Sequence, residues 1–203
     1  MRRARPFRPP ILVLATNVFV LAAAGDAMAC ACCSNEGQRF VETEAINAYA
    51  AGLIGDLKFA GDAKLFTGEA DPEYITGVTA TSTDFRLDVA KSEDRWIFKF
   101  SDEKNSGELT FKLPRSITRF EVDPREFDAQ SQPNGPTLYK EWRLTAKAVG
   151  SGLLKGAASG DQRATLIFHG QGNSCTDASQ FTAWTLVLHG SKANVTFFGK
   201  LVP

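Results

Sequence analysis

The chain has 203 residues, among them 15 phenylalanines and three tryptophans, and its 23 basic residues equal its 23 acidic residues in number. This balance, with the lysines and arginines spaced singly, excludes the strongly cationic surface that nucleic acids and anionic membranes require, so we expect neither as a partner. The length suffices for one well-filled core, and no linker or low-complexity stretch indicates a second domain.

An export signal is predicted over residues 1–29. A start with four arginines precedes an apolar run, Ile11–Ala24, and the small-residue cleavage pattern Ala27-Met28-Ala29. The run is shorter than the roughly 20 residues that cross a bilayer, so we interpret it as a signal rather than an anchor. The pair Arg2-Arg3 lacks the neighbours of a twin-arginine signal, which favours the general secretory route. We expect a periplasmic or extracellular mature chain with 19 basic and 22 acidic residues and no transmembrane span.

Cysteines dominate the start of the expected mature chain. Cys30, Cys32 and Cys33 lie in a predicted N-terminal arm, residues 30–42, and Cys175 lies far away in a single β-rich domain, residues 43–203. In an oxidising compartment, this arrangement favours a disulfide from Cys32 or Cys33 to Cys175. Such a bond would close a long loop and stabilise the fold by about 4 to 5 kcal/mol in the chain-entropy model.

Other interpretations of these cysteines remain open. Cys30 would be the lipid-modified first residue of a lipoprotein, although the signal has Ala27 where such signals usually have leucine. Thiolates at this spacing also suit copper or zinc, with Cys30, Cys32, Cys33 and His169 as the candidate ligands. An exposed pair of neighbouring thiols would support redox chemistry.

One helix is predicted near the start of the domain, and strands follow it. Apolar residues recur at three- and four-residue intervals over residues 43–57, which is the stripe of an amphipathic helix. A first hairpin is expected to turn at Gly61-Asp62, with a short strand over 75–79 after Asp71-Pro72. Period-two alternation then predicts strands over 85–89, 96–100, 109–113, 117–122, 138–149, 163–168, 181–189 and 193–201.

The strands are joined mostly by short turns rather than by crossover helices, which indicates an antiparallel sheet. We therefore expect a mainly all-β fold: an antiparallel β-sandwich or flattened barrel of about nine to ten strands with one short N-terminal helix. The aromatic residues would fill its interior. Several strands are apolar on both faces, which keeps the sandwich among the alternatives.

Residues 169–180 form the polar loop where a site is most expected. His169, Asn173, Ser174 and Asp177 are its candidate ligand-binding residues. The same loop would serve a hydrolase if Ser174 or Cys175 acted with His169 and Asp177, but no Gly-x-Ser-x-Gly elbow is present. If the flanking strands pair, His169 and His189 lie at opposite ends of the pair and do not share a site.

No motif in the sequence indicates a particular reaction or cofactor. The sequence favours an exported, non-catalytic β-rich protein of the cell envelope that binds an unknown ligand or envelope partner and is stabilised by a disulfide to Cys175. The alternative is a thiol-based protein that binds copper or zinc, or is redox-active, through Cys30, Cys32 and Cys33. The two differ in thiol state, because the first requires bonded sulfurs and the second free or metal-bound ones.

Overall fold

The computed structural model describes residues 39–122, 138–172 and 177–203, which are mainly β-strand with one α-helix, α1 (Ala48–Asp56). This confirms the prediction of an antiparallel, mainly all-β fold with a single helix. The strands are β1 (Arg39–Ala45), β2 (Lys58–Phe59), β3 (Asp62–Phe66), β4 (Asp84–Lys91), β5 (Arg95–Ser101), β6 (Ser106–Lys112), β7 (Ser116–Val122), β8 (Leu138–Gly150), β9 (Arg163–Gly172), β10 (Phe181–His189) and β11 (Asn194–Val202).

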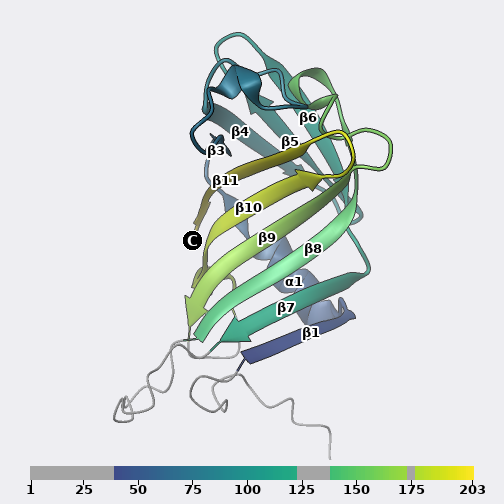
Figure 1. The fold of residues 1–203 in the computed structure, drawn as a ribbon. Coiled ribbons are helices and arrows are strands. Elements are labelled where there is room, and N and C mark those ends of the chain that lie inside the picture. The colour runs from purple at the N-terminus through teal and green to yellow at the C-terminus, as the bar shows by residue number, and fades with distance from the viewer. Residues whose placement is uncertain (1–38, 123–137, 173–176) are drawn as a thin grey trace, which may run out of the picture.

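Eight of these strands form a closed barrel rather than a sandwich. The order β8–β6–β5–β4–β3–β11–β10–β9 returns to β8, because β9 pairs with β8 as well as with β10 (Figure 1). The long strand β8 makes this closure possible. It pairs with β9 over Leu138–Lys147, while its last residues, Ala148–Gly150, pair with β6 on the other side. Closure removes the two free edges that an open sheet would expose.

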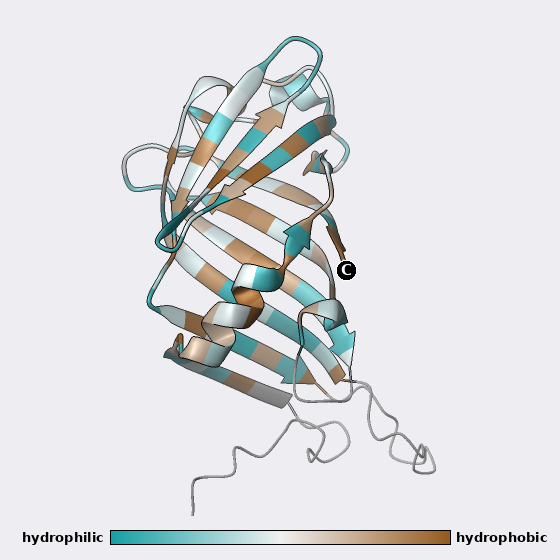
Figure 2. Ribbon diagram, turned by 180° about the vertical axis from the view of Figure 1, so that it is seen from behind, coloured by the Kyte–Doolittle hydropathy of each residue, from teal (hydrophilic) through white to brown (hydrophobic). Residues whose placement is uncertain are grey.

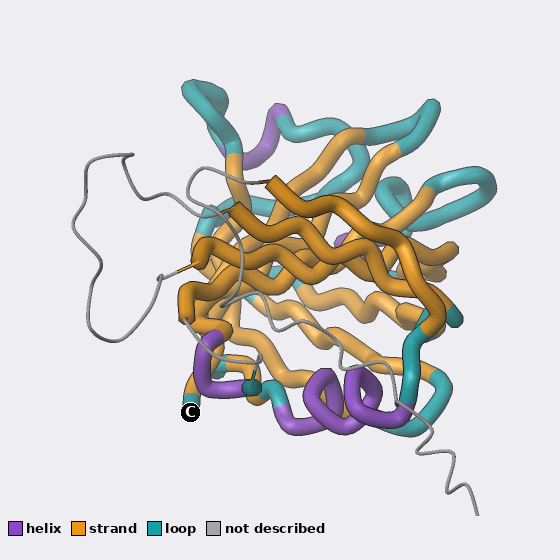
Figure 3. The backbone as a smooth tube through the Cα atoms, turned by 90° about the horizontal axis from the view of Figure 1, so that it is seen from below, coloured by secondary structure: helices purple, strands orange, loops and turns teal. Residues whose placement is uncertain are grey.

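Three further strands lie outside the closed ring. β7 pairs with the first half of β8, and β1 pairs with β7, so these two strands extend the wall at one end of the barrel (Figure 1). β2 pairs with the end of β11. Seen from behind, α1 lies in front of the β7–β10 wall, below the β4–β5 hairpin (Figure 2). From below, α1 and the short 3₁₀ helix Ala178–Gln180 line one side of the barrel opening (Figure 3).

Side chains fill the barrel interior. Alternate residues of each strand point inward, and the aromatic ones, including all three tryptophans, are buried. An eight-stranded barrel has an interior just wide enough for side chains or for one small ligand, and here side chains occupy it. The largest members of this core are Trp96, Trp142, Trp184, Phe98, Phe100, Phe111, Phe168 and Phe197.

The predicted helix over residues 43–57 is wrong in its first part. Residues up to Ala45 belong to β1, which pairs with β7 from Arg39↔Val122 to Ala45↔Ser116. The helix begins only after Asn47, whose side chain accepts a hydrogen bond from the Ala50 N–H at 2.8 Å and so acts as the N-cap. The pairing with β7 is a long-range interaction that overrides the local helical spacing. None of the helices in the described part of the chain is long and apolar enough to cross a membrane.

Two further local predictions are also wrong. β2 and β3 do not form a hairpin through Gly61-Asp62, because both pair with β11 as two segments along one strand. The segment 75–79 contains no strand and follows a 3₁₀ turn, Pro72–Tyr74. Gly61-Asp62 therefore marks an interruption between two strands that pair with the same partner, β11, rather than a hairpin turn.

Candidate functional site

The barrel wall opens between β2 and β4. β3 pairs with β4 over Asp62–Lys64, and the last bond of this ladder joins the Leu87 N–H to the Gly61 carbonyl at 2.9 Å. Beyond that bond, β4 continues to Lys91 while β2 follows β11, and no ladder joins β2 to β4 among the described residues. The two segments therefore diverge from Gly61 and leave a seam in the wall.

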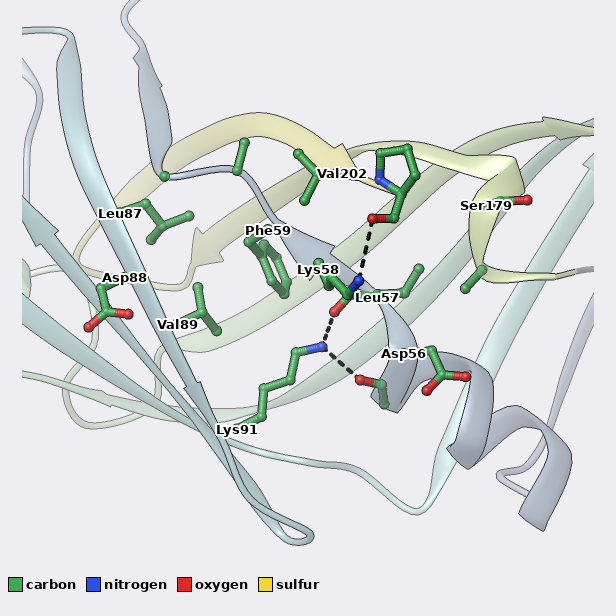
Figure 4. Close-up of a pocket in the computed structure, with 15 residues that line it drawn as sticks. Asp56, Leu57, Lys58, Phe59, Leu87, Asp88, Val89, Lys91, Ser179 and Val202 are labelled. Atoms are coloured by element: carbon green, nitrogen blue, oxygen red, sulfur yellow. Dashed lines mark hydrogen bonds between the residues drawn. The ribbon is translucent and has the colours of Figure 1, made fainter.

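An open groove of about 870 Å³ occupies this seam (Figure 4). Its lining comes from the end of α1, β2, β4, the 3₁₀ helix Ala178–Gln180 and the end of β11, and it mixes apolar side chains with the charged residues Asp56, Lys58, Asp88 and Lys91. Ligand sites typically have volumes of roughly 300–1,000 Å³ and combine an apolar lining with a small number of polar groups. Its apolar lining residues include Leu57, Phe59, Leu87, Val89 and Val202, of which Leu57 and Leu87 are buried.

Backbone polar groups face the groove as well. Along an antiparallel strand the backbone groups point alternately to the two sides. The Leu87 N–H points to the β2 side, so the backbone of Val89 points there too. On the opposite segment the Ala60 N–H bonds to Lys200 of β11 at 3.0 Å, so the backbone of Phe59 faces the seam. The groove thus presents backbone donors and acceptors beside apolar side chains.

Lys91 spans the wide end of the seam. Its ammonium group donates to the carbonyl of Gly55, in the last turn of α1, at 3.1 Å and to the carbonyl of Leu57, the residue that follows α1 (Figure 4). The same Nζ lies 4.5 Å from the centre of the Trp96 ring. Burial lowers the pKa of Lys91 to about 8, although the charge of Asp56 opposes this shift. The lysine therefore bonds to the C-terminal end of the helix and contributes a cation to the groove, although the residue as a whole is exposed.

Phe59 separates the groove from the barrel interior. Its ring packs against Phe98, Trp184 and Trp96, with ring centres 5.4, 5.5 and 5.8 Å away, in edge-to-face arrangements. Phe59 is the only residue of β2 with these contacts, since Lys58 points outward and donates to the Pro203 carbonyl at 3.4 Å. A molecule in the groove would therefore lie on Phe59 rather than enter the core.

The first part of the loop predicted at residues 169–180 belongs to a strand. β9 continues to Gly172, so His169 lies within the sheet, and it is opposite Ala183 while His189 is opposite Arg163. The two histidines therefore lie far apart along the pair, as expected. Asn173, Ser174, Cys175 and the cluster Cys30, Cys32 and Cys33 lie outside the described residues.

Asp177 has a local structural role. It precedes the 3₁₀ helix Ala178–Gln180, and its carboxylate accepts from the Ser179 N–H at 2.8 Å and from the Ser179 hydroxyl. The hydroxyl bond is the main cause that lowers the pKa of Asp177. No hydrogen bond or ion pair joins Asp177 to His169 in the described structure. The two described members of the predicted loop site thus make separate contacts.

His169 belongs instead to a network on the outer face of β8, β9 and β10. Its Nδ1 lies 3.1 Å from the Tyr139 hydroxyl, which donates to Glu141 at 2.7 Å, and its Nε2 lies 2.9 Å from the Thr185 hydroxyl. Arg143 donates to the second oxygen of Glu141 at 2.8 Å through Nε. Both ring nitrogens of His169 are therefore engaged within the sheet, and a metal ion would have to displace one of these bonds.

The network holds its groups in defined protonation states. Burial lowers the pKa of His169, and the opposing charge of Glu141 only partly offsets it. Burial alone would raise the pKa of Glu141, but bonds from Tyr139 and Arg143 bring it below its usual value. Burial and the adjacent carboxylate raise the pKa of Tyr139 to about 12. At neutral pH the network is a neutral imidazole and a neutral phenol beside an Arg–Glu ion pair.

A second set of charges lies inside the wall, and the sequence analysis did not identify it. Lys140 is 0% exposed and donates to Gln180 Oε1 at 2.8 Å, and it is opposite Glu121, which is 8% exposed. Burial raises the pKa of Glu121, and the charges of Lys140 and Arg119 oppose the rise. Arg119 in turn pairs with Glu44 at 2.7 Å. The period of two already places Lys140 on the face of Trp142 and Leu144, so this signal was present in the sequence.

Three comparisons with known proteins identify no relative. No family model, no curated protein and no solved structure matches the chain. The function of the chain must therefore be inferred from its own geometry.

Proposed function

We propose that this chain is an exported, non-catalytic β-barrel protein that binds a small, largely apolar ligand in the groove between β2 and β4. The observation that carries this proposal is the open seam, with its volume of about 870 Å³, in a barrel whose interior is filled. The export signal predicted over residues 1–29 supports a periplasmic or extracellular location.

The lining of the groove explains why an apolar ligand fits. Burying apolar surface stabilises a complex by about 25 cal/mol per Å², and the exposed part of the lining supplies such surface. Val202 is 45% exposed there, and Val89 and Phe59 are half-buried. A ligand that covers these side chains removes apolar area from water without requiring the barrel to open.

A disulfide remains part of this proposal. A bond from Cys32 or Cys33 to Cys175 would tie the N-terminal arm to the barrel, whereas the thiol-based alternative needs Cys30, Cys32 and Cys33 free or metal-bound. The intact mass of the exported protein, taken natively and after denaturation and alkylation, separates the two. Unreactive sulfurs support the disulfide, and a metal adduct lost on denaturation with alkylated cysteines supports the alternative.

The groove itself is tested with a neutral apolar dye, N-phenyl-1-naphthylamine, whose fluorescence rises on binding. Val202→Trp fills the groove from its rim and should weaken dye binding about tenfold, because the added ring occupies the ligand volume. Val149→Trp is the matched control, since Val149 is 71% exposed on β8 and does not line the groove. Equal affinities in all three proteins, or an equal loss in both variants, would overturn the assignment of the groove.

A further inference from the structure

We propose that the ligand of the groove is a monocarboxylate with an apolar chain, and that Lys91 binds its carboxylate. This inference rests on the proposed function and adds the chemistry of the ligand's polar end. It starts from one feature of the lining: the ammonium group of Lys91 lies against two carbonyls and two aromatic rings and forms no ion pair in the described part of the chain, although the residue as a whole is exposed. A cation fixed in this position favours an anion in the same groove, because their opposite charges attract.

The hydrogen bonds of Lys91 leave one donor available. An ammonium group has three N–H donors, and the carbonyls of Gly55 and Leu57 take two of them. No third acceptor for Lys91 lies in the described part of the chain. The rings of Trp96 and Phe59, with centres 4.5 and 5.5 Å from Nζ, shield the group from water on one side. A carboxylate oxygen in the groove would accept a hydrogen bond from the remaining N–H and neutralise the charge of Lys91.

The other charges of the groove do not neutralise Lys91. Asp56 at the end of α1 acts on it electrostatically, but no hydrogen bond or ion pair joins the two among the described contacts. Asp88, three residues earlier on β4, is exposed and forms no ion pair with Lys91 in the described part of the chain, and Lys58 on β2 donates to an oxygen of Pro203 instead. Among the described lining residues, Lys91 is therefore the cation that lies against aromatic rings and has no ion pair.

The same charges favour a monoanion over a phosphate. A phosphate monoester carries about −1.5 to −2 charges at neutral pH and needs several donors, such as a guanidinium or a set of backbone N–H groups. The groove offers one free N–H of Lys91 beside backbone N–H groups of β2 and β4, and its described lining contains no guanidinium. Asp56 and Asp88 lie on its rim, so a dianion would meet more repulsion there than a single carboxylate, which matches the one charge of Lys91.

Proton linkage gives the proposal a characteristic pH dependence. The ammonium of Lys91 titrates at about 8 in the free protein, because burial disfavours its charged form. A bound carboxylate favours that charged form, so binding at pH 8 should be accompanied by proton uptake. Above pH 8 the free protein loses the proton, so carboxylate affinity should fall about tenfold from pH 7 to pH 9. A neutral ligand of the same chain length should show no such dependence.

The experiment compares decanoate with decanol by titration calorimetry on the full mature chain, at pH 7 and pH 9. Decanoate should bind wild-type protein about tenfold more tightly than decanol at pH 7, and the advantage should disappear at pH 9. Lys91→Arg keeps a permanent charge and should retain decanoate binding at pH 9, whereas Lys91→Met should bind both probes like decanol. Lys64→Met, which removes an exposed lysine outside the groove, is the control and should behave as wild type.

The outcomes separate the two proposals. Equal binding of decanoate and decanol by wild-type protein at pH 7 would overturn the role of Lys91 and leave the apolar groove intact. A preference for decanoate that persists in Lys91→Met would also overturn it, by locating the carboxylate elsewhere. Binding of neither probe would overturn the groove as a ligand site altogether. The comparison in wild-type protein alone is decisive, so it holds even if a Lys91 variant fails to fold.

Discussion

Phe59 provides the sharpest test of the barrel architecture, because a two-residue strand places its half-buried ring against the aromatic core. Its ring contacts rings from three other strands: Trp96 and Phe98 of β5, Phe168 of β9 and Trp184 of β10. If β2 were the first arm of a hairpin with β3, these contacts would not be required. Replacing Phe59 therefore tests both the seam and the position of β2 along β11.

The expected cost follows from the volume removed and the rings left without a partner. Phe→Ala changes in protein cores cost about 3 to 5 kcal/mol. Phe59 is half-buried, so we expect the lower end, about 3 kcal/mol, for Phe59→Ala, and about 1 kcal/mol for Phe59→Leu, which retains most of the volume. For a domain of this size, a loss of about 3 kcal/mol lowers Tm by roughly 6 to 12 °C.

Urea unfolding followed by tryptophan fluorescence measures this change directly, since two of the contacted rings are Trp96 and Trp184. Phe66→Ala is the matched control: Phe66 is 63% exposed on β3, and its loss should change stability by less than about 0.5 kcal/mol. A Phe59→Ala variant no less stable than Phe66→Ala would refute the placement of Phe59 in the core, and with it the floor of the groove.

Four further substitutions test other parts of the structure. Gly107→Ala should destabilise the fold by about 1 to 3 kcal/mol in thermal unfolding, because its new Cβ would lie 2.6 Å from a backbone oxygen. Gly52→Ala, which has open space around its position in α1, should instead stabilise the fold by up to about 1 kcal/mol. Burial lowers the pKa of His169 below 6.5, so the neutral imidazole stabilises the fold above that pH, and this stabilisation is lost as the pH falls through the folded-state pKa. The His169→Gln variant should therefore lose less stability on acidification than the wild-type protein. An unchanged urea-unfolding profile between pH 7.5 and pH 5 would contradict this role. Tyr139→Phe should cost about 1 kcal/mol by removing the bond to Glu141, and should raise the pKa of that carboxylate in an NMR titration; an unshifted carboxyl resonance would count against the network.

The sequence by itself determined most of the strands and the character of the core. Period-two alternation identified eight strands, β4 to β11, with boundaries close to those observed, since alternation is a local consequence of having one buried face. The abundance of aromatic residues indicated a filled interior, and the absence of crossover helices indicated an antiparallel sheet. These features depend on neighbours in the chain, so a single sequence carries them.

Only the tertiary structure decided which strands pair and where the site lies. Residues 43–45 have helical spacing yet form a strand, because β7 offers backbone partners more than 70 residues away. The groove arises where segments 57–61 and 87–91 diverge, and each segment alone reads as an ordinary strand. Likewise, the carboxylate that meets His169 is Glu141 on the adjacent strand rather than the nearby Asp177. Alternation fixes which face a side chain occupies but not which strand lies beside it, and pairing between distant strands assembled both the groove and the His169 network.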